Sequence, residues 1–127
     1  LLRGKAQFVA DIRMPGILHA AFVRSSHAHA RINGIDTTAA LAVPGVVAVL
    51  TASDIRAHVV MDRLVVALPD KTYRQQRDRP ILADTETVYI GEAIALVLAE
   101  DPYLAEDAAG LVDIGYDPLP AAADCRD

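Results

Sequence analysis

The chain has 127 residues, 53% of them hydrophobic but only 5% aromatic, and a formal net charge of −5. This length suits one domain, and the acidic balance argues against a nucleic-acid surface, which requires clustered Lys and Arg. No stretch approaches the roughly 18–20 apolar residues of a membrane span, and the first residues do not resemble a signal peptide. A single cysteine, Cys125, excludes an internal disulfide. We therefore expect one acidic domain, located in the cytoplasm and without a membrane span.

The first half of the chain is expected to form short strands joined by turns. Its apolar and β-branched residues predict strands at residues 6–10, 17–24, 31–35 and 46–50. Residues 17–24 carry largely apolar side chains on both faces, which predicts a buried strand. Asp36 is expected to cap a short helix ending at Leu41, and residues 51–55 to form one helical turn.

The stretch from Arg56 to Asp78 differs in composition from its surroundings. Pro69-Asp70-Lys71 interrupts its apolar residues, so we expect a long loop that leaves room for one strand near residues 63–67. Loops of this length are usually functional or pack against another domain. Its basic side chains are expected to form a solvated face or an interface: Arg74, Arg77 and Arg79.

The most informative stretch is residues 88–121, because it holds the longest apolar run. Residues 93–99 have no charge and no turn signal, which predicts a strand covered on both faces. Asp101 and Pro102 then mark a helix start. The aspartate can accept hydrogen bonds from free backbone N–H groups, and proline has no N–H to satisfy.

The expected helix covers residues 101–112 and carries one apolar stripe. The stripe recurs at helical spacing through Leu104, Ala108, Leu111 and Val112. Residues 113–116 follow as a second strand. The pattern of strand, helix and strand predicts a helix that crosses between two strands of one sheet.

His27-Ala28-His29 is the most prominent local candidate for a metal site. On a strand the two imidazoles would share a face and could bind one metal ion together. His19 and Asp11 could be further ligands, but no local spacing ties them to the pair. The alternative, which we favour, is that both histidines lie in a loop and make ordinary hydrogen bonds.

Two other local arrangements could carry chemistry. Ser25 and Ser26 precede His27, but no acid partner or oxyanion loop is recognisable near this possible nucleophile. Glu92 follows Gly91 at a break in a strand, where a bulge would turn its carboxylate toward solvent or a partner. A catalytic acid is the alternative for Glu92, and a surface carboxylate is favoured. We assign no catalytic, cofactor-binding or metal-binding residue.

The order of segments along the chain adds a more specific signal. Residues 18–55 have the sequence LHAAFVRSSHAHARINGIDTTAALAVPGVVAVLTASDI, and residues 79–121 have RPILADTETVYIGEAIALVLAEDPYLAEDAAGLVDIGYDPLPA. The second stretch contains a strand, a Gly-Glu bend, a strand, a helix and a Leu-Pro pair. In this combination the chain resembles molybdenum hydroxylase large subunits, which include xanthine dehydrogenases, aldehyde oxidases and the carbon monoxide dehydrogenase type. Ser26 and Ala93 stand where that family commonly has proline.

The resemblance implies an α+β fold, the α/β hammerhead, with a mixed sheet and two main helices. Residues 1–127 would be a single hammerhead domain and a fragment of a longer molybdopterin-binding subunit. Leu1 is not an initiator methionine and no structural element closes the chain at Asp127, so the sequence also looks like a segment. The family's pterin contacts, substrate pocket and catalytic glutamate would lie beyond Asp127.

The resemblance also implies an activity for the full enzyme, with this segment as non-catalytic scaffold and interface. That activity would be hydroxylation of an aldehyde or a purine-like heterocycle, or oxidation of carbon monoxide. Molybdopterin with molybdenum would carry the chemistry, with 2Fe–2S clusters and FAD on partner domains or subunits. Expected partners are the downstream molybdopterin-binding domains, the iron–sulfur and flavin components, and a second copy of the segment. The alternative is a self-contained binding or structural domain with no redox role.

Overall fold

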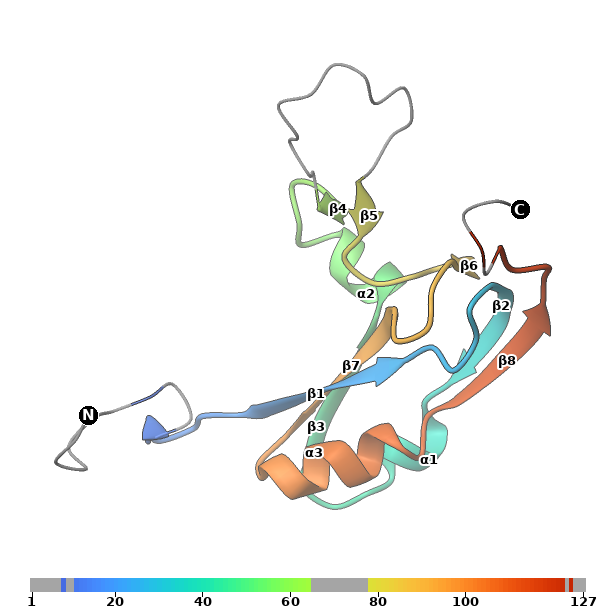
Figure 1. Ribbon diagram of the computed structural model, residues 1–127. Coiled ribbons are helices and arrows are strands. Elements are labelled where there is room, and N and C mark those ends of the chain that lie inside the picture. The colour runs from blue at the N-terminus through green and yellow to red at the C-terminus, as the bar shows by residue number, and fades with distance from the viewer. Residues whose placement is uncertain (1–7, 9–10, 65–77, 123, 125–127) are drawn as a thin grey trace, which may run out of the picture.

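The computed structural model describes residues 8, 11–64, 78–122 and 124, and its strands form three small sheets (Figure 1). Sheet A has the order β1-β7-β3, from His19–Arg24, Ala93–Ala99 and Val46–Thr51. Sheet B has the order β6-β2-β8, from Glu86–Thr87, Ala30–Asp36 and Asp113–Pro118. A separate pair joins β4 to β5, from Arg63–Leu64 and Arg79–Pro80. The helices are α1, α2 and α3, from Thr38–Leu41, Ala52–Arg56 and Pro102–Ala109.

Strand β7 is the centre of sheet A, with β1 and β3 antiparallel on either side of it. Val97 pairs with Ala21 of β1 and with Val49 of β3. The charge-free run therefore forms a central strand, as predicted. Its burial is uneven, however: Val97 is fully buried, whereas Leu96 and Leu98 on the opposite face are only half-buried.

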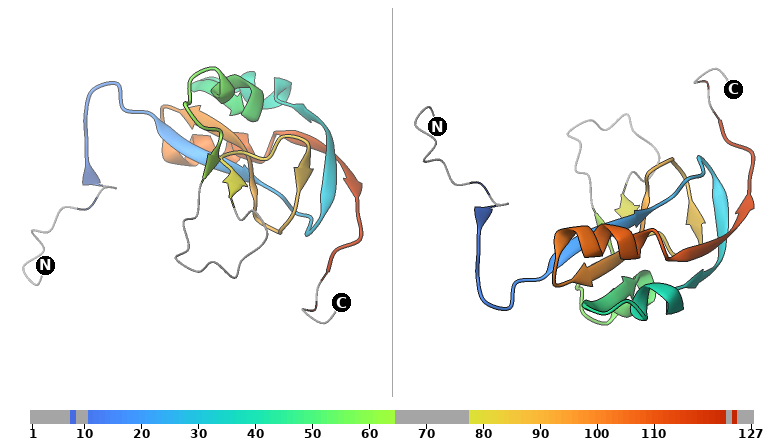
Figure 2. Two further views of the ribbon diagram at one scale, coloured as in Figure 1. Left: turned by 90° about the horizontal axis from the view of Figure 1, so that it is seen from above. Right: turned by 90° about the horizontal axis from the view of Figure 1, so that it is seen from below.

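Helix α3 begins where the sequence predicts. Asp101 Oδ1 accepts hydrogen bonds from the backbone N–H groups of Tyr103 (2.9 Å) and Leu104 (3.2 Å), and Pro102 occupies the first turn. In the view from below, α3 lies across β1 and β7 (Figure 2). Small side chains allow this close approach, and the buried residues of the contact are Ala21, Ala99 and Ala105.

The predicted course and length of this helix need correction. Helix α3 connects β7 of sheet A to β8 of sheet B, so it does not cross between two strands of one sheet. It also ends at Ala109, because the next residues form a tighter turn in which Leu111 N donates to Ala108 O at 3.0 Å. The expected apolar stripe is therefore shorter, with Ala108 fully buried and Leu111 47% exposed.

The expected α+β class is confirmed, but the mixed sheet is not. Every strand pair in the described part is antiparallel. One helix of eight residues and two of four and five residues are present instead of two main helices. None of these described helices is long and apolar enough to cross a membrane.

The expectations for the N-terminal half hold only in part. The helices near Asp36 and Thr51 are confirmed: Asp36 Oδ1 accepts a hydrogen bond from Thr38 N at 2.9 Å, and Thr51 caps α2. The expected burial of residues 17–24 on both faces is wrong, because Phe22 is 46% exposed while Ala21 is 2% exposed. Residues 6–10, except the eighth, lie outside the described residues, as does most of the expected strand at 63–67.

Gly45 gives a test of how the β3 end of sheet A meets α3. Its φ is +90°, and a Cβ added there would lie 2.7 Å from Leu104 Cδ2. We expect Gly45→Ala to lower the free energy of unfolding by about 1–2 kcal/mol, because L-residues avoid this backbone region. Urea unfolding measures the change. Gly34→Ala is the control, because Gly34 has no positive φ and a Cβ added there would meet nothing within 4 Å; equal losses in both variants would contradict the account.

Candidate functional site

Several sequence candidates gather where the β1–β2 connection meets the segment between β6 and β7, namely Ser25, His27, His29 and Glu92. Two backbone hydrogen bonds join these segments: Ser25 N donates to Glu92 O, and Gly91 N donates to Ser25 O, both at 2.8 Å. Arg24 Nη1 adds a bond to Gly91 O at 2.9 Å. We call this place the loop junction.

The two serines are used differently at the loop junction. Ser25 is buried, and its Oγ lies 2.9 Å from the carbonyl oxygen of His27 and 3.2 Å from Oγ1 of the buried Thr87. It also accepts a hydrogen bond from His27 N, so Ser25 holds the loop together. Ser26 Oγ lies 3.0 Å from His27 Nδ1 on the surface, and the His27 ring packs against Tyr116 with centroids 4.4 Å apart.

His29 bridges the loop junction to the end of β8. Its Nδ1 lies 2.6 Å from Pro120 O and its Nε2 lies 2.5 Å from Glu86 Oε1. Both partners are acceptors, so both bonds form together only when each ring nitrogen carries a proton. The hydrogen bond to the Pro120 carbonyl, followed by that to Glu86, raises the pKa of His29 above its usual 6.5. The favoured interpretation, a hydrogen-bonded loop histidine, is confirmed for this residue.

This bridge predicts a pH dependence of stability. Because the pKa of His29 is raised in the folded protein, its contribution is complete below about pH 6.5 and is lost as the pH rises through the folded-state pKa. We therefore expect the urea midpoint of the wild type to fall above about pH 6.5 by more than that of His29→Gln, which has no such titration. His58→Gln is the control and should parallel the wild type. Parallel curves for the wild type and His29→Gln would contradict the bridge.

Glu92 is buried, so the expectation of a surface carboxylate is wrong. The residue is only 3% exposed, and its Oε2 accepts a hydrogen bond from Val88 N at 2.7 Å. Gly91, with φ +85°, turns the chain so that Glu92 faces inward across this turn. The carboxylate thus closes the turn from Val88 to Glu92 and holds it against the loop junction.

The candidate metal ligands weighed in the sequence, none of which was assigned, are not brought together. His27 and His29 lie in a loop with different partners, and Asp11 Oδ2 accepts a hydrogen bond from Phe8 N at 3.0 Å. His19 begins β1 and pairs with Ala99. Among the residues that the structure describes, no group of three or more His, Cys, Asp or Glu side chains is placed to hold a metal ion.

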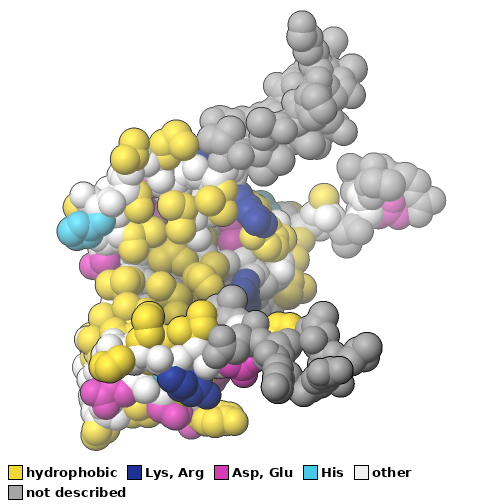
Figure 3. Space-filling view, turned by 90° about the vertical axis from the view of Figure 1, so that its left-hand side faces the viewer, with side chains coloured by type: hydrophobic (Ala, Val, Ile, Leu, Met, Phe, Trp, Pro, Cys, Tyr) yellow, Lys and Arg dark blue, Asp and Glu magenta, His cyan; other side chains and the backbone are white. Residues whose placement is uncertain are grey.

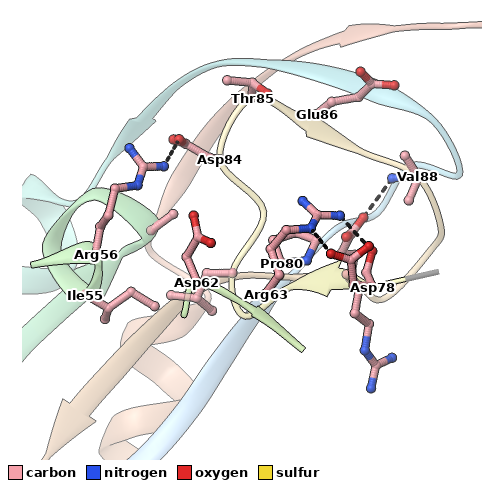
Figure 4. A pocket seen from close by; sticks show the side chains of 14 residues that line it. Ile55, Arg56, Asp62, Arg63, Asp78, Pro80, Asp84, Thr85, Glu86 and Val88 are labelled. Carbon is pink, nitrogen blue, oxygen red and sulfur yellow. Dashed lines mark hydrogen bonds and ion pairs between the residues drawn. The ribbon is translucent and has the colours of Figure 1, made fainter. Parts of the chain in front are cut away.

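A cleft of about 410 Å³ lies beside the loop junction, between α2, the β4–β5 pair and the residues before β7 (Figure 4). Four of its eight charged side chains form two ion pairs with each other. Arg56 Nη2 lies 2.6 Å from Asp84 Oδ2, and Arg63 Nε lies 2.8 Å from Asp78 Oδ2. The hydrogen bond that Arg56 donates to Asp84 raises the pKa of Arg56. The cleft therefore has two internal ion pairs, and acidic side chains outnumber arginines in its lining by five to three.

Local sequence patterns gave no signal for this cleft. It combines residues on both sides of the loop from Arg56 to Asp78, and only the tertiary fold places them together. Arg79, which was expected to lie on a solvated face or at an interface, lines the cleft. Arg74, Arg77 and Cys125 lie outside the described residues.

Comparison with known proteins places this geometry in a family. Residues 3–120 match the model of the aldehyde oxidase and xanthine dehydrogenase a/b hammerhead domain. The chain is 42% identical to the carbon monoxide dehydrogenase large chain of Afipia carboxidovorans, covering 96% of this chain and 14% of that protein. It is 44% identical to the 6-hydroxypseudooxynicotine dehydrogenase complex subunit gamma of Paenarthrobacter nicotinovorans, covering 98% of this chain and 16% of that protein.

Solved structures agree with the sequence comparison. The Cu,Mo-CO dehydrogenase crystal structure superposes with a TM-score of 0.84 at 41% identity, over 97% of this chain and 14% of that chain. Quinoline 2-oxidoreductase from Pseudomonas putida 86 gives a TM-score of 0.84 at 37% identity, over 94% and 15%. The chain thus spans about one-seventh of the length of these relatives. The chain belongs to the aldehyde oxidase and xanthine dehydrogenase family, and it corresponds to the a/b hammerhead domain of that family.

Proposed function

We propose that residues 1–127 form one domain of a longer molybdopterin-binding subunit, in a molybdenum-dependent oxidoreductase of the cytoplasm. The observation that carries the proposal is the family match over residues 3–120, together with relatives named as dehydrogenases and an oxidoreductase. The full enzyme would hydroxylate an aldehyde or a purine-like heterocycle, or oxidise carbon monoxide. Iron–sulfur clusters and FAD would lie on partner domains or subunits.

Within that enzyme, we propose that this domain is non-catalytic scaffold and interface. The polar side chains that first looked like catalytic candidates have structural partners. Glu92 closes a turn, Ser25 holds the β1–β2 connection and His29 bridges to Pro120. Side chains that are hydrogen-bonded in this way position backbone segments. Their removal should lower the free energy of unfolding and leave the catalytic turnover of the full enzyme largely unchanged.

The described residues do not fit a molybdopterin. A large anionic pterin needs converging N–H donors or unpaired basic side chains for its phosphate. In the cleft, Arg56 and Arg63 are paired with aspartates, and the three arginines of the lining, Arg79 included, face five acidic side chains that would repel a phosphate. We therefore assign the cofactor to other parts of the parent chain and derive no reaction step from these residues.

Metal analysis of two proteins tests the proposal. The full-length gene product, expressed with its partner subunits, should contain stoichiometric molybdenum and reduce a dye with an aldehyde, a heterocycle or carbon monoxide. The 127-residue segment should contain no molybdenum and show background activity. Stoichiometric molybdenum on the segment would overturn the non-catalytic role, whereas a full-length product without molybdenum would overturn the enzyme class.

The alternative of a self-contained binding domain with no redox role receives less support. The relatives that match nearly the whole chain carry enzyme names, and the chain covers only 14–16% of two of them. A full-length gene product no longer than this chain would favour the alternative.

A further inference from the structure

One face of sheet A is apolar, and within the described part of the chain it has no covering layer of secondary structure. Side chains alternate along a strand, so the face away from α3 carries residues of all three strands in register. Two adjacent rows make up this set, Ala20, Leu98 and Ala48, and then Phe22, Leu96 and Leu50. None of the six is charged or polar. We call this set the open face.

The distribution of side-chain sizes in sheet A is inverted. On the α3 side, the closed face is filled by small residues such as Ala95 and Ala99, both fully buried. On the open face, Phe22 is 46% exposed and Leu96 is half-buried. Large apolar side chains normally occupy the interior of a protein. Sheet A therefore has α3 as a layer on its closed face and, among the described residues, no such layer on its open apolar face.

The surface view agrees with this description. Figure 3, which views the molecule from the left of Figure 1, shows hydrophobic side chains gathered in the middle of this side and charged side chains towards its margins. Leu18, which leads into β1, extends the apolar surface and is 39% exposed. An apolar centre with a charged rim is typical of a surface that another protein layer covers.

We propose that the open face is the docking surface for another part of the same polypeptide, which packs an apolar, uncharged surface on it. The inference rests on the proposed function in taking this chain as one domain of a longer one. About six-sevenths of the carbon monoxide dehydrogenase large chain lies outside the matched segment, because the match covers 14% of that protein. Enough chain is therefore present to supply the missing layer.

A partner domain linked to this one through the backbone is favoured over a second copy of the chain as the occupant of the open face. A domain linked through the backbone faces this surface at an effective concentration of the order of millimolar, whereas a second copy must associate from dilute solution. The six residues of the open face carry no charge, and at its edge the Arg24 guanidinium carbon lies 5.3 Å from the centre of the Phe22 ring. The occupant is therefore expected to present mainly aliphatic and aromatic side chains. Docking would complete the core of sheet A around Phe22 and Leu96.

Hydroxyl-radical footprinting of the full-length gene product, purified without other subunits, tests the proposal. Phe22 and Leu111 are 46% and 47% exposed in this structure, and Leu111 lies beyond α3, so it is a matched control. After correction for intrinsic reactivity, Phe22 and Leu96 should oxidise several-fold more slowly than Leu111. This protection should not change with protein concentration. Phe22→Lys should restore fast oxidation at Leu96, whereas Leu111→Lys should not.

Each other outcome overturns the proposal. Equal rates at Phe22 and Leu111 would show that the open face is not selectively covered. Protection that rises with concentration, together with dimers in light scattering, would assign the face to a second copy. Protection that appears only when another subunit is added would assign it to that subunit. Metal analysis of the full-length product expressed with its partner subunits is read separately, so a failure of the proposed enzyme class is distinguishable from a failure of the docking surface.

Discussion

Replacing Ile94 by alanine is expected to lower the free energy of unfolding by about 2–5 kcal/mol. Ile94 lies in the central strand β7, is fully buried and is among the largest fully buried side chains in the described structure. Removing three carbons there loses apolar contact and leaves a cavity that the flanking strands cannot fill without shifting. Chemical unfolding monitored by circular dichroism measures the change.

Ile90→Ala is the matched control for this prediction. Ile90 is 68% exposed and lies in the turn before β7, so the same chemical change should alter stability by no more than about 0.5 kcal/mol. Equal losses for the two variants would show that β7 is not the centre of the core.

Replacing Glu92 by alanine is expected to lower the free energy of unfolding by about 1–3 kcal/mol, the second large effect. The change removes the carboxylate oxygen of the buried Glu92 that accepts the Val88 N–H at 2.7 Å, and so breaks a part-buried hydrogen bond that closes the turn. Glu92→Gln retains an acceptor of similar length, so it should recover part of the loss. If the glutamine variant were as unstable as the alanine variant, the hydrogen bond would not be the cause.

The sequence could predict those features of the fold that depend on neighbouring residues. The charge-free run at Ala93–Ala99 is a central strand, and Asp101 and Pro102 begin a helix through contacts within one turn. The resemblance, which depends on the order of many segments, is confirmed by the family match. The strand and helix patterns are local, and the resemblance accumulates over many segments, so both can be detected in a single sequence.

The errors concern contacts between distant parts of the chain. Glu92 looked like a surface residue because Gly91 breaks the strand, and its burial depends on the segment around Ser25 docking against it. Helix α3 joins two sheets because β8 pairs with β2 and not with β1, β3 or β7. Phe22 was expected inside because its neighbours are apolar, yet no described element covers its face. Local periodicity carries no information on these pairings.

The most direct test of the non-catalytic role is turnover per bound molybdenum in the full-length enzyme carrying Glu92→Gln. Glu92 is the one early candidate for a catalytic acid, and the structure shows it closing a turn. We expect molybdenum content and turnover per molybdenum to match the wild type, with only a lower unfolding midpoint. A loss of turnover of about 100-fold or more in a variant that folds and binds molybdenum normally, the size expected when a general acid is removed, would contradict the account.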